Sequence, residues 1–281
     1  MKKRYVLLLF IIGLSVFSTP KLIAQSQDST QTQATEASSQ SQWIDLSCDL
    51  MSRYMWRGTQ FGGNSPSIQP GIELNYKNFT LGTWGAYSTG GVHASQELDL
   101  YASVNLFKDM FTVIVTDYYF PSDTANYDYL GYDSKTGHVL EGGLIFNGTK
   151  KIPITFSAYV NFYGHDAKRM GDNPADTTTF NKDIGLQFSN YFELGYTKTL
   201  KGGIDFQAFL GFTLSNPKAA DSSIGYMGEQ GFYGDAPGIV NVGFTVSKGV
   251  KITKSYSLPL TASFIVNPNA KSVHLVFGLS F

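Results

Sequence analysis

The sequence predicts an all-β protein, a transmembrane antiparallel up-and-down β-barrel of about 12 strands. Three observations predict it. Apolar residues recur at every second position in many segments between residue 43 and the C-terminus. Long and short connections alternate between these segments. The N-terminus has the composition of an export signal.

Alternation with period two places the apolar side chains on one face of a sheet and the polar side chains on the other. In the clearest segment, Leu98, Leu100, Ala102, Val104 and Leu106 alternate with Glu97, Asp99, Tyr101, Ser103 and Asn105. Each segment has about ten residues, the length that a tilted strand needs to cross a bilayer. The expected strands are 44–56, 67–76, 79–88, 96–106, 110–120, 138–147, 153–163, 189–199, 204–214, 239–249, 257–266 and 272–281.

The connections distinguish a membrane barrel from a soluble sandwich. Membrane barrels have tight turns on the periplasmic side and long loops on the outside. Here the short connections include 77–78, 107–109 and 200–203, and the pattern lapses once, because the expected turn 250–256 exceeds the expected loop 267–271. The long connections are 57–66, 89–95, 121–137, 164–188 and 215–238.

Composition agrees with a membrane protein built from strands. Charged residues make up 15% of the chain, whereas soluble proteins have about 25%. After the N-terminal segment no apolar run is long enough for a transmembrane helix. The single cysteine excludes an intramolecular disulfide.

The N-terminus reads as a secretory signal peptide over residues 1–24, with Lys2, Lys3 and Arg4 before an apolar stretch. Residues 25–42 are mostly Gln, Ser, Thr and Ala, a composition that predicts a disordered periplasmic leader. The barrel would occupy residues 43–281. Without the four basic residues of the signal, 17 basic residues face 22 acidic ones, a formal net charge of −5. Such a chain is not basic enough for a nucleic-acid partner.

If the apolar face meets lipid, the opposite face lines the lumen. The expected lumen-lining residues are Asp45, Asp49, Arg53, Arg57, Glu73, Glu97, Asp99, Asp117, Glu141, Glu193 and Asp205. Asp117 belongs here only if the turn near Lys108 and Asp109 is longer than two residues or carries a bulge, because a two-residue turn would point it outward. Twelve strands leave a lumen of roughly 10 Å between side chains, enough for ions and small solutes.

Two interpretations of these charges stay open. They could form internal salt bridges, with Arg53 and Arg57 neutralising nearby carboxylates. Alternatively, the excess of carboxylates could line a water-filled path and favour cations mildly.

Aromatic residues gather near strand ends, where interfacial girdles lie. The girdle on the loop side would hold Tyr54, Trp56, Tyr87 and Tyr118, and the girdle on the turn side Tyr76, Phe79, Phe192 and Tyr196. The final Phe281, spaced by two from Leu279 and Phe277, resembles the C-terminal signal that the barrel assembly machinery reads.

A family resemblance starts at the first strand. The run Ser52-Arg53-Tyr54-Met55-Trp56-Arg57-Gly58, followed by Pro66 and by Gln69-Pro70, resembles the start of the TorF-like family of porins. Those proteins are Gram-negative outer-membrane barrels, mostly of undetermined function. The resemblance implies a channel-like barrel over residues 44–281, and it implies no substrate and no catalytic residues.

Catalytic and metal-binding motifs are not evident. No H-E-x-x-H helix, G-x-S-x-G elbow or phosphate-cradling glycine loop occurs. The pair His93 and Ser95 resembles the His-x-Ser arrangement of outer-membrane phospholipases only in spacing. Asp123, Asp128 and Asp133 follow no calcium-loop pattern. We therefore expect no enzyme, no cofactor and no metal.

The sequence thus predicts a bacterial outer-membrane porin whose partners are the lipid bilayer, the assembly machinery and the small hydrophilic solutes or ions that diffuse through it. The alternative is a plugged barrel whose long extracellular loops act as an adhesin or scaffold.

Overall fold

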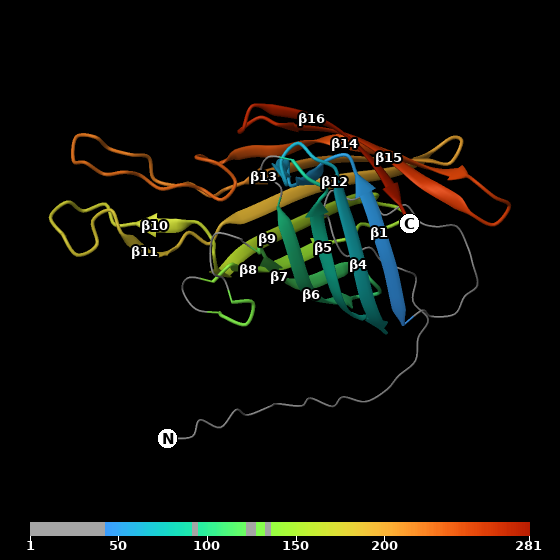
Figure 1. Cartoon of the computed structure of the whole chain (residues 1–281), viewed down its shortest axis with the longest axis horizontal. Helices are drawn as coiled ribbons and strands as arrows, with labels where there is room; N and C mark the ends of the chain where they lie inside the picture. Colours follow the sequence, from blue (N-terminus) through green and yellow to red (C-terminus); the bar gives the residue numbers. More distant parts are fainter. Residues whose placement is uncertain (1–42, 92–94, 122–127, 133–135) are drawn as a thin grey trace, which may run out of the picture.

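The computed structural model describes residues 43–91, 95–121, 128–132 and 136–281, which form sixteen β-strands (Figure 1). The expected signal peptide and leader lie outside these residues. Twelve strands are part of one sheet: β1 (Ile44–Met51), β4 (Ser67–Tyr76), β5 (Phe79–Ser88), β6 (Gln96–Leu106), β7 (Phe111–Tyr119), β8 (His138–Phe146), β9 (Ile154–Gly164), β12 (Asn190–Leu200), β13 (Ile204–Thr213), β14 (Gly238–Lys251), β15 (Ser257–Asn267) and β16 (Ser272–Ser280). Two short hairpins complete the fold: β2 (Tyr54–Trp56) with β3 (Thr59–Phe61), and β10 (Lys168–Met170) with β11 (Asp183–Leu186). Among the described residues no helix is both long and apolar enough to cross a membrane.

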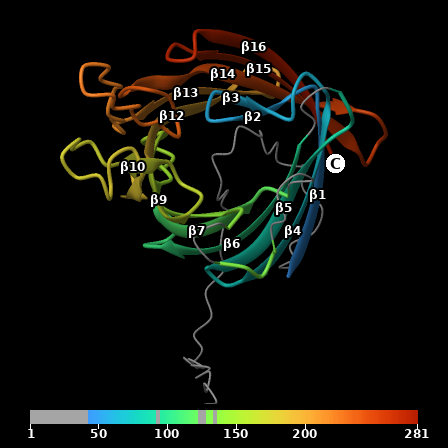
Figure 2. The same cartoon turned by 60° about the vertical axis from the view of Figure 1, so that its left-hand side comes forward.

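The twelve long strands form a closed antiparallel barrel in the order β1-β16-β15-β14-β13-β12-β9-β8-β7-β6-β5-β4, seen as a ring in Figure 2. Strand β1 pairs with β4 on one side and with β16 on the other. At this seam Phe281 donates its backbone N–H to the carbonyl of Cys48 (3.1 Å) and accepts one in return (3.3 Å). Closure leaves the sheet with no free edge. The predicted fold, a twelve-strand up-and-down barrel, is confirmed.

The outer face of the barrel is apolar because the register aligns the apolar half of each alternating segment. Leu74 of β4 pairs with Leu81 of β5, which pairs with Ala102 of β6, which pairs with Val115 of β7. Leu74, Leu81 and Val115 are all exposed. A belt of this kind is stable in lipid and would be unfavourable in water.

The connections sort by length onto the two ends. The turn end holds the connections 77–78, 107–110, 147–153, 201–203 and 252–256. The loop end holds 52–66, 89–95, 120–137, 165–189 and 214–237, and also the short 268–271. The turn at 201–203 is tight because Gly202 and Gly203 both adopt positive φ (82° and 67°), which glycine does without a steric penalty.

Eleven of the expected segments agree with a strand of the barrel to within two residues at each end. The first segment is wrong in extent, since 44–56 was expected and β1 ends at Met51. After a break the chain continues as the hairpin β2–β3, which lies inside the ring of strands in Figure 2. The chain reverses at Arg57 and Gly58, both at positive φ (48° and 76°). Gly58 sits so close to β14 that a Cβ there would lie 2.0 Å from the carbonyl oxygen of Val240.

The expected loop-side girdle is wrong at Tyr54, Trp56 and Tyr118. The hairpin carries Tyr54 and Trp56 into the barrel, where both are buried. Tyr118 is buried on the inner face of β7, opposite Asp99. Tyr76 and Phe79, expected on the turn side, are exposed on the outer face, where interfacial aromatic residues lie.

Candidate functional site

The candidate site is the interior of the barrel. Of the expected lumen-lining residues, the register places these on the inner face of strands: Asp45, Asp49, Glu73, Glu97, Asp99, Glu141, Glu193 and Asp205. Each alternates with exposed or half-exposed apolar side chains of the outer face. The side chains come from six different strands, so only barrel closure brings them around one space.

Arg57 lies at the centre of this space, at the turn of the β2–β3 hairpin. Its guanidinium makes two hydrogen bonds with Glu141, Nη1 to Oε2 at 2.5 Å and Nη2 to Oε1 at 2.8 Å. Arg57 is 3% and Glu141 2% exposed. A buried ion pair is stable only when its geometry is good and its other polar atoms have partners, and this two-point geometry is the strongest that arginine makes with a carboxylate.

Aromatic rings enclose the guanidinium. Its Cζ lies 4.5 Å from the ring centre of Trp56, 4.2 Å from Tyr159 and 4.6 Å from Tyr191. Tyr233, from the long connection before β14, accepts a hydrogen bond from Arg57 Nη1 at 2.5 Å. Cation–π contacts are stronger in such a desolvated setting than at a surface.

Tyrosines also hold the carboxylates. Tyr118 donates to Glu141 Oε1 at 2.9 Å, and Tyr101 donates to Glu73 Oε1 at 2.7 Å. Glu193 accepts a hydrogen bond from Tyr191 and one from the amide of Asn241 at 3.2 Å. Each carboxylate therefore has a fixed position on the inner wall.

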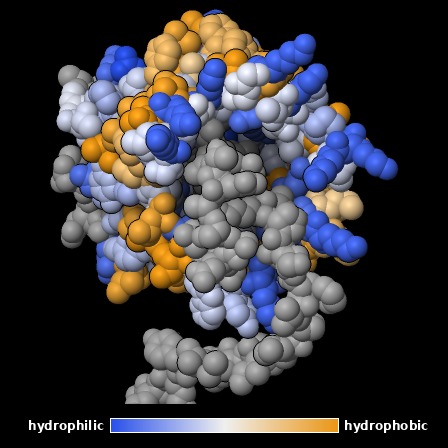
Figure 3. All heavy atoms as spheres, turned by 90° about the vertical axis from the view of Figure 1, so that its right-hand side faces the viewer, coloured by the Kyte–Doolittle hydropathy of each residue, from blue (hydrophilic) through white to orange (hydrophobic). Residues whose placement is uncertain are grey.

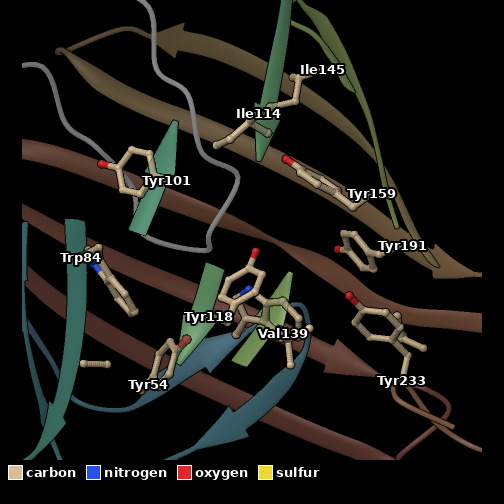
Figure 4. Close-up of a cluster of buried hydrophobic side chains, with 13 residues drawn as sticks. Tyr54, Trp84, Tyr101, Ile114, Tyr118, Val139, Ile145, Tyr159, Tyr191 and Tyr233 are labelled. Atoms are coloured by element: carbon tan, nitrogen blue, oxygen red, sulfur yellow. The ribbon is translucent and has the colours of Figure 1, made fainter. Parts of the chain in front are cut away.

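The rings form one continuous cluster across the loop-end half of the barrel (Figure 4). Trp56 stacks on Tyr233 with ring centres 5.7 Å apart and meets Tyr118 edge-on at 5.6 Å. Tyr54 lies 5.4 Å from Trp84. The hairpin thus packs against several strands at once and fills part of the interior.

The turn-end half is open along some strands only. Ser47, Thr197, Thr199 and Asp205 are exposed and stand on the inner face of β1, β12 and β13. Other inner-face residues at this end are buried, namely Thr112, Ile145, Ser247 and Thr261. Nearer the loop end the carboxylates are buried: Glu97, Asp99, Glu141 and Glu193.

Two predicted residues lie elsewhere. Arg53 is outside the barrel strands, and its guanidinium donates to the backbone carbonyl of Asn64. Asp117 is on the outer face, so the prediction that it lines the lumen is wrong. Leu106 lies opposite Phe111, which is the register that a two-residue turn at Lys108-Asp109 would give. In this register Asp117 pairs with Leu100, whose side chain faces outward, so Asp117 faces outward too.

At its actual position Asp117 belongs to a cluster at the loop end. Its Oδ1 lies 2.8 Å from Nδ1 of His138, and its Oδ2 accepts a hydrogen bond from Tyr132 at 2.6 Å. The ring of Tyr132 stacks on His138 at 4.2 Å. These contacts hold the described part of the connection 120–137 against the outside of the barrel.

Of the inward aromatic residues, the sequence analysis placed only Tyr101 in phase with inner carboxylates, and it expected Tyr118 in an interfacial girdle. A signal was present, because Tyr101, Tyr118, Tyr159 and Tyr191 all stand in phase with the inner carboxylates of their own or neighbouring strands. Their role in fixing Arg57 could not be read without knowing that the hairpin enters the barrel.

No group of three or more histidines, cysteines or acidic residues that could hold a metal ion occurs among the described residues. His93, Asp123 and Asp133, which the sequence analysis considered for catalysis or calcium, lie outside those residues.

With the barrel and its interior described, its relatives can be compared. The sequence model of a family described as "Bacterial protein of unknown function (Gcw_chp)" matches residues 34–229, more than two thirds of the chain. The chain belongs to this family. The Gcw_chp match includes β1 to β13 and therefore the hairpin and all the inner carboxylates. The resemblance to TorF-like porins is not confirmed by this match and stays a prediction.

No curated protein matches the sequence. Among solved structures, the chain is similar to a KdgM porin at 8% identity and a TM-score of 0.42, over 84% of this chain and 97% of that one. It is also similar to a chain described as "Unveiling the Mechanism Behind the in-meso Crystallization of Membrane Proteins", at 10% identity and a TM-score of 0.41, over 84% and 81% of the two chains. Likenesses at this level concern the fold alone.

Proposed function

We propose that this protein is a bacterial outer-membrane channel for passive diffusion of ions or small hydrophilic solutes, narrowed by its inward-folded hairpin. A closed barrel with an apolar outer belt satisfies every backbone hydrogen bond within a bilayer, which supports the membrane location. The exposed Phe277 and Phe281 at the end of the chain support recognition by the barrel assembly machinery.

The observation that carries the proposal is the charge of the inner wall. Eight carboxylates from the barrel strands face inward, whereas Arg57 is the cation that contacts them within the described residues. Glu73 is half-buried and Asp205 is exposed, so a passing ion would meet these two before the buried carboxylates. Carboxylates around an aqueous path favour cations, so we propose a mild preference for cations.

The test is a planar bilayer containing the purified full-length mature protein, with KCl at different concentrations on the two sides. The reversal potential should have the sign that corresponds to K⁺ moving more easily than Cl⁻. Glu73→Gln with Asp205→Asn should shift it towards zero, and the outer-face variant Asp117→Asn is the matched control that should leave it unchanged. Anion selectivity, or no conductance, would contradict the proposal.

A plugged barrel that serves as a scaffold is the second candidate, and one observation favours it. The connections 165–189 and 214–237 form an ordered arm beyond the barrel (Figure 1). Glu229 joins them, accepting hydrogen bonds from the backbone N–H of Met170 (3.0 Å) and of Lys218 (2.8 Å). A barrel that stays closed to ions even after its hairpin is removed would favour this candidate.

A further inference from the structure

The turn end of the barrel is ringed by lysines. They occupy the tips of five successive turns: Lys77, Lys108, Lys150, Lys151, Lys201 and Lys254. All six are exposed. Figure 3 views the molecule from this side and shows hydrophilic side chains projecting beside hydrophobic ones. We call these six residues the lysine rim.

The lysine rim has no internal counter-ion within the described part of the chain. None of its amino groups makes a hydrogen bond or salt bridge there, and the closest approach to a ring is that of Lys77 to Tyr76 at 5.3 Å. Asp109, beside Lys108 in the same turn, forms no salt bridge among the described residues, and two other carboxylates at this end are engaged elsewhere. Asp205 accepts a hydrogen bond from Thr199 at 2.8 Å, and Asp45 accepts one from Asn75 at 2.9 Å.

The loop end is different. Lys218 pairs with Asp172, while Lys168 and Lys182 donate to backbone carbonyls of their own loop at 2.9 and 3.0 Å. Lysines at that end are thus used to hold loops, whereas those of the rim point to a partner outside the chain.

Neighbouring side chains place the rim at the level of a membrane interface. Phe107, beside Lys108, is 74% exposed, and Phe79 and Ile152 flank the turns of Lys77 and Lys151 with exposed side chains. Lys198 and Lys248 extend the charge onto the outer face, since their cross-strand partners Phe206 and Leu260 face outward. Lysine beside aromatic and apolar groups is the arrangement that reaches from the apolar region to the headgroups.

We propose that the lysine rim binds anionic phospholipids of the periplasmic leaflet, with the lysine amino groups on the lipid phosphates. The inference rests on the proposed membrane location but not on conduction. Each lysine near an anionic lipid surface strengthens binding about fivefold. Several lysines around one circumference would therefore select anionic over zwitterionic lipids and hold the barrel at a fixed depth.

The experiment uses the full-length mature protein in neutral detergent micelles. Phosphatidylglycerol or phosphatidylcholine is added, and retained lipid is counted by native mass spectrometry. Phosphatidylglycerol should be retained preferentially, and the preference should fall at high salt because exposed charges are screened. The variant Lys77→Gln/Lys108→Gln/Lys151→Gln should weaken retention of phosphatidylglycerol about a hundredfold. The control Lys182→Gln/Lys218→Gln/Lys271→Gln removes the same charge from the loop end and should keep it.

Equal retention of the two lipids, or equal loss in both variants, would overturn the inference. Glycerol phosphate, which lacks acyl chains, should not displace the lipid at equal concentration. Displacement by it would mean that the rim binds free phosphate, and displacement by a soluble anionic glycan would mean a polymer partner; either result would refute the lipid assignment. If the proposed channel function were wrong but the lipid proposal right, the protein would show no conductance and would still prefer phosphatidylglycerol.

Discussion

Charged side chains at the two ends of the barrel differ in whether they have partners inside the protein. Towards the loop end, Arg57 and Glu141 are buried and bonded to each other and to tyrosines. At the turn end, the lysine rim is exposed and has no partner within the described residues. We infer that contacts inside the protein hold the charged side chains of the loop end, whereas those of the turn end interact with the surrounding lipid. Substitutions at the loop end should therefore change stability and conductance, and those at the turn end should change the interaction with lipid.

The largest effect is expected from breaking the buried ion pair. Arg57→Ala leaves the carboxylate of Glu141 without its cation and should lower the free energy of unfolding by about 3–5 kcal/mol. Guanidinium unfolding in lipid vesicles would measure it. The control Arg53→Ala removes a part-exposed arginine that contacts a backbone carbonyl and should cost at most about 1 kcal/mol. Similar losses for both variants would mean that the ion pair does not organise the interior.

A charge on the outer belt should have the next largest effect. Val115→Arg puts a guanidinium on the lipid-facing side of β7 and should cost about 2–4 kcal/mol in the same unfolding experiment. The matched variant Thr199→Arg places the same group on the accessible inner face of β12 and should cost clearly less. If the inner variant were the more destabilised, the assignment of the two faces would be reversed.

A methyl group at the hairpin turn should have a smaller but specific effect. Gly58→Ala introduces a side chain at φ 76°, 2.0 Å from the carbonyl oxygen of Val240. A strained backbone of this kind costs about 1–3 kcal/mol. Gly202→Ala is the control, because Gly202 also has positive φ (82°) but nothing within 4 Å. Only Gly58→Ala should displace the hairpin and raise single-channel conductance; an equal rise in the control would contradict this.

The smallest effect concerns the arm at the loop end. Hydrogen bonds from Thr178 and Thr179 lower the pKa of Asp176 from 3.8 to about 2. A lowered pKa stabilises the folded arm above pH 3.8, and this contribution is lost as the pH falls towards 2. The protection of the amides of residues 173–182 against hydrogen exchange, relative to their intrinsic rates at each pH, should therefore fall over that interval. In Asp176→Asn this protection should be less dependent on pH there, and an unchanged dependence would assign the effect to another group.

Strand positions could be predicted from the sequence because a lipid-facing belt requires apolar residues at every second position. The hairpin β2–β3 could not, since Tyr54 and Trp56 continue the alternation of β1 across the break, and the reversal at Arg57-Gly58 depends on packing against Val240. The prediction that Asp117 lines the lumen was wrong for a related reason. It depended on the length of the turn before β7, and a change of one residue in register moves every side chain of a strand to the other face.

The inner carboxylates could likewise be placed by alternation, but their partners could not. Arg57 meets Glu141 across 84 positions and Tyr233 across 176, and neither separation follows from local pattern. The sequence left open internal salt bridges and a cation path; the structure shows one internal salt bridge, and the cation path stays a proposal. Arg57 and Glu141 form the internal pair, whereas Glu73 and Asp205 remain without a salt bridge in the described part of the barrel.

The most direct test of the narrowed channel is the single-channel conductance of the protein with and without its hairpin. Replacing residues 54–61 by a short Gly-Ser linker removes Trp56 and Arg57 from the interior and leaves the barrel strands intact. Glu141→Gln should accompany the deletion, so that no buried carboxylate is left uncompensated. The account predicts a small conductance for the wild type and a severalfold larger one for this variant. Equal conductance in the two proteins, or none in either, would contradict it.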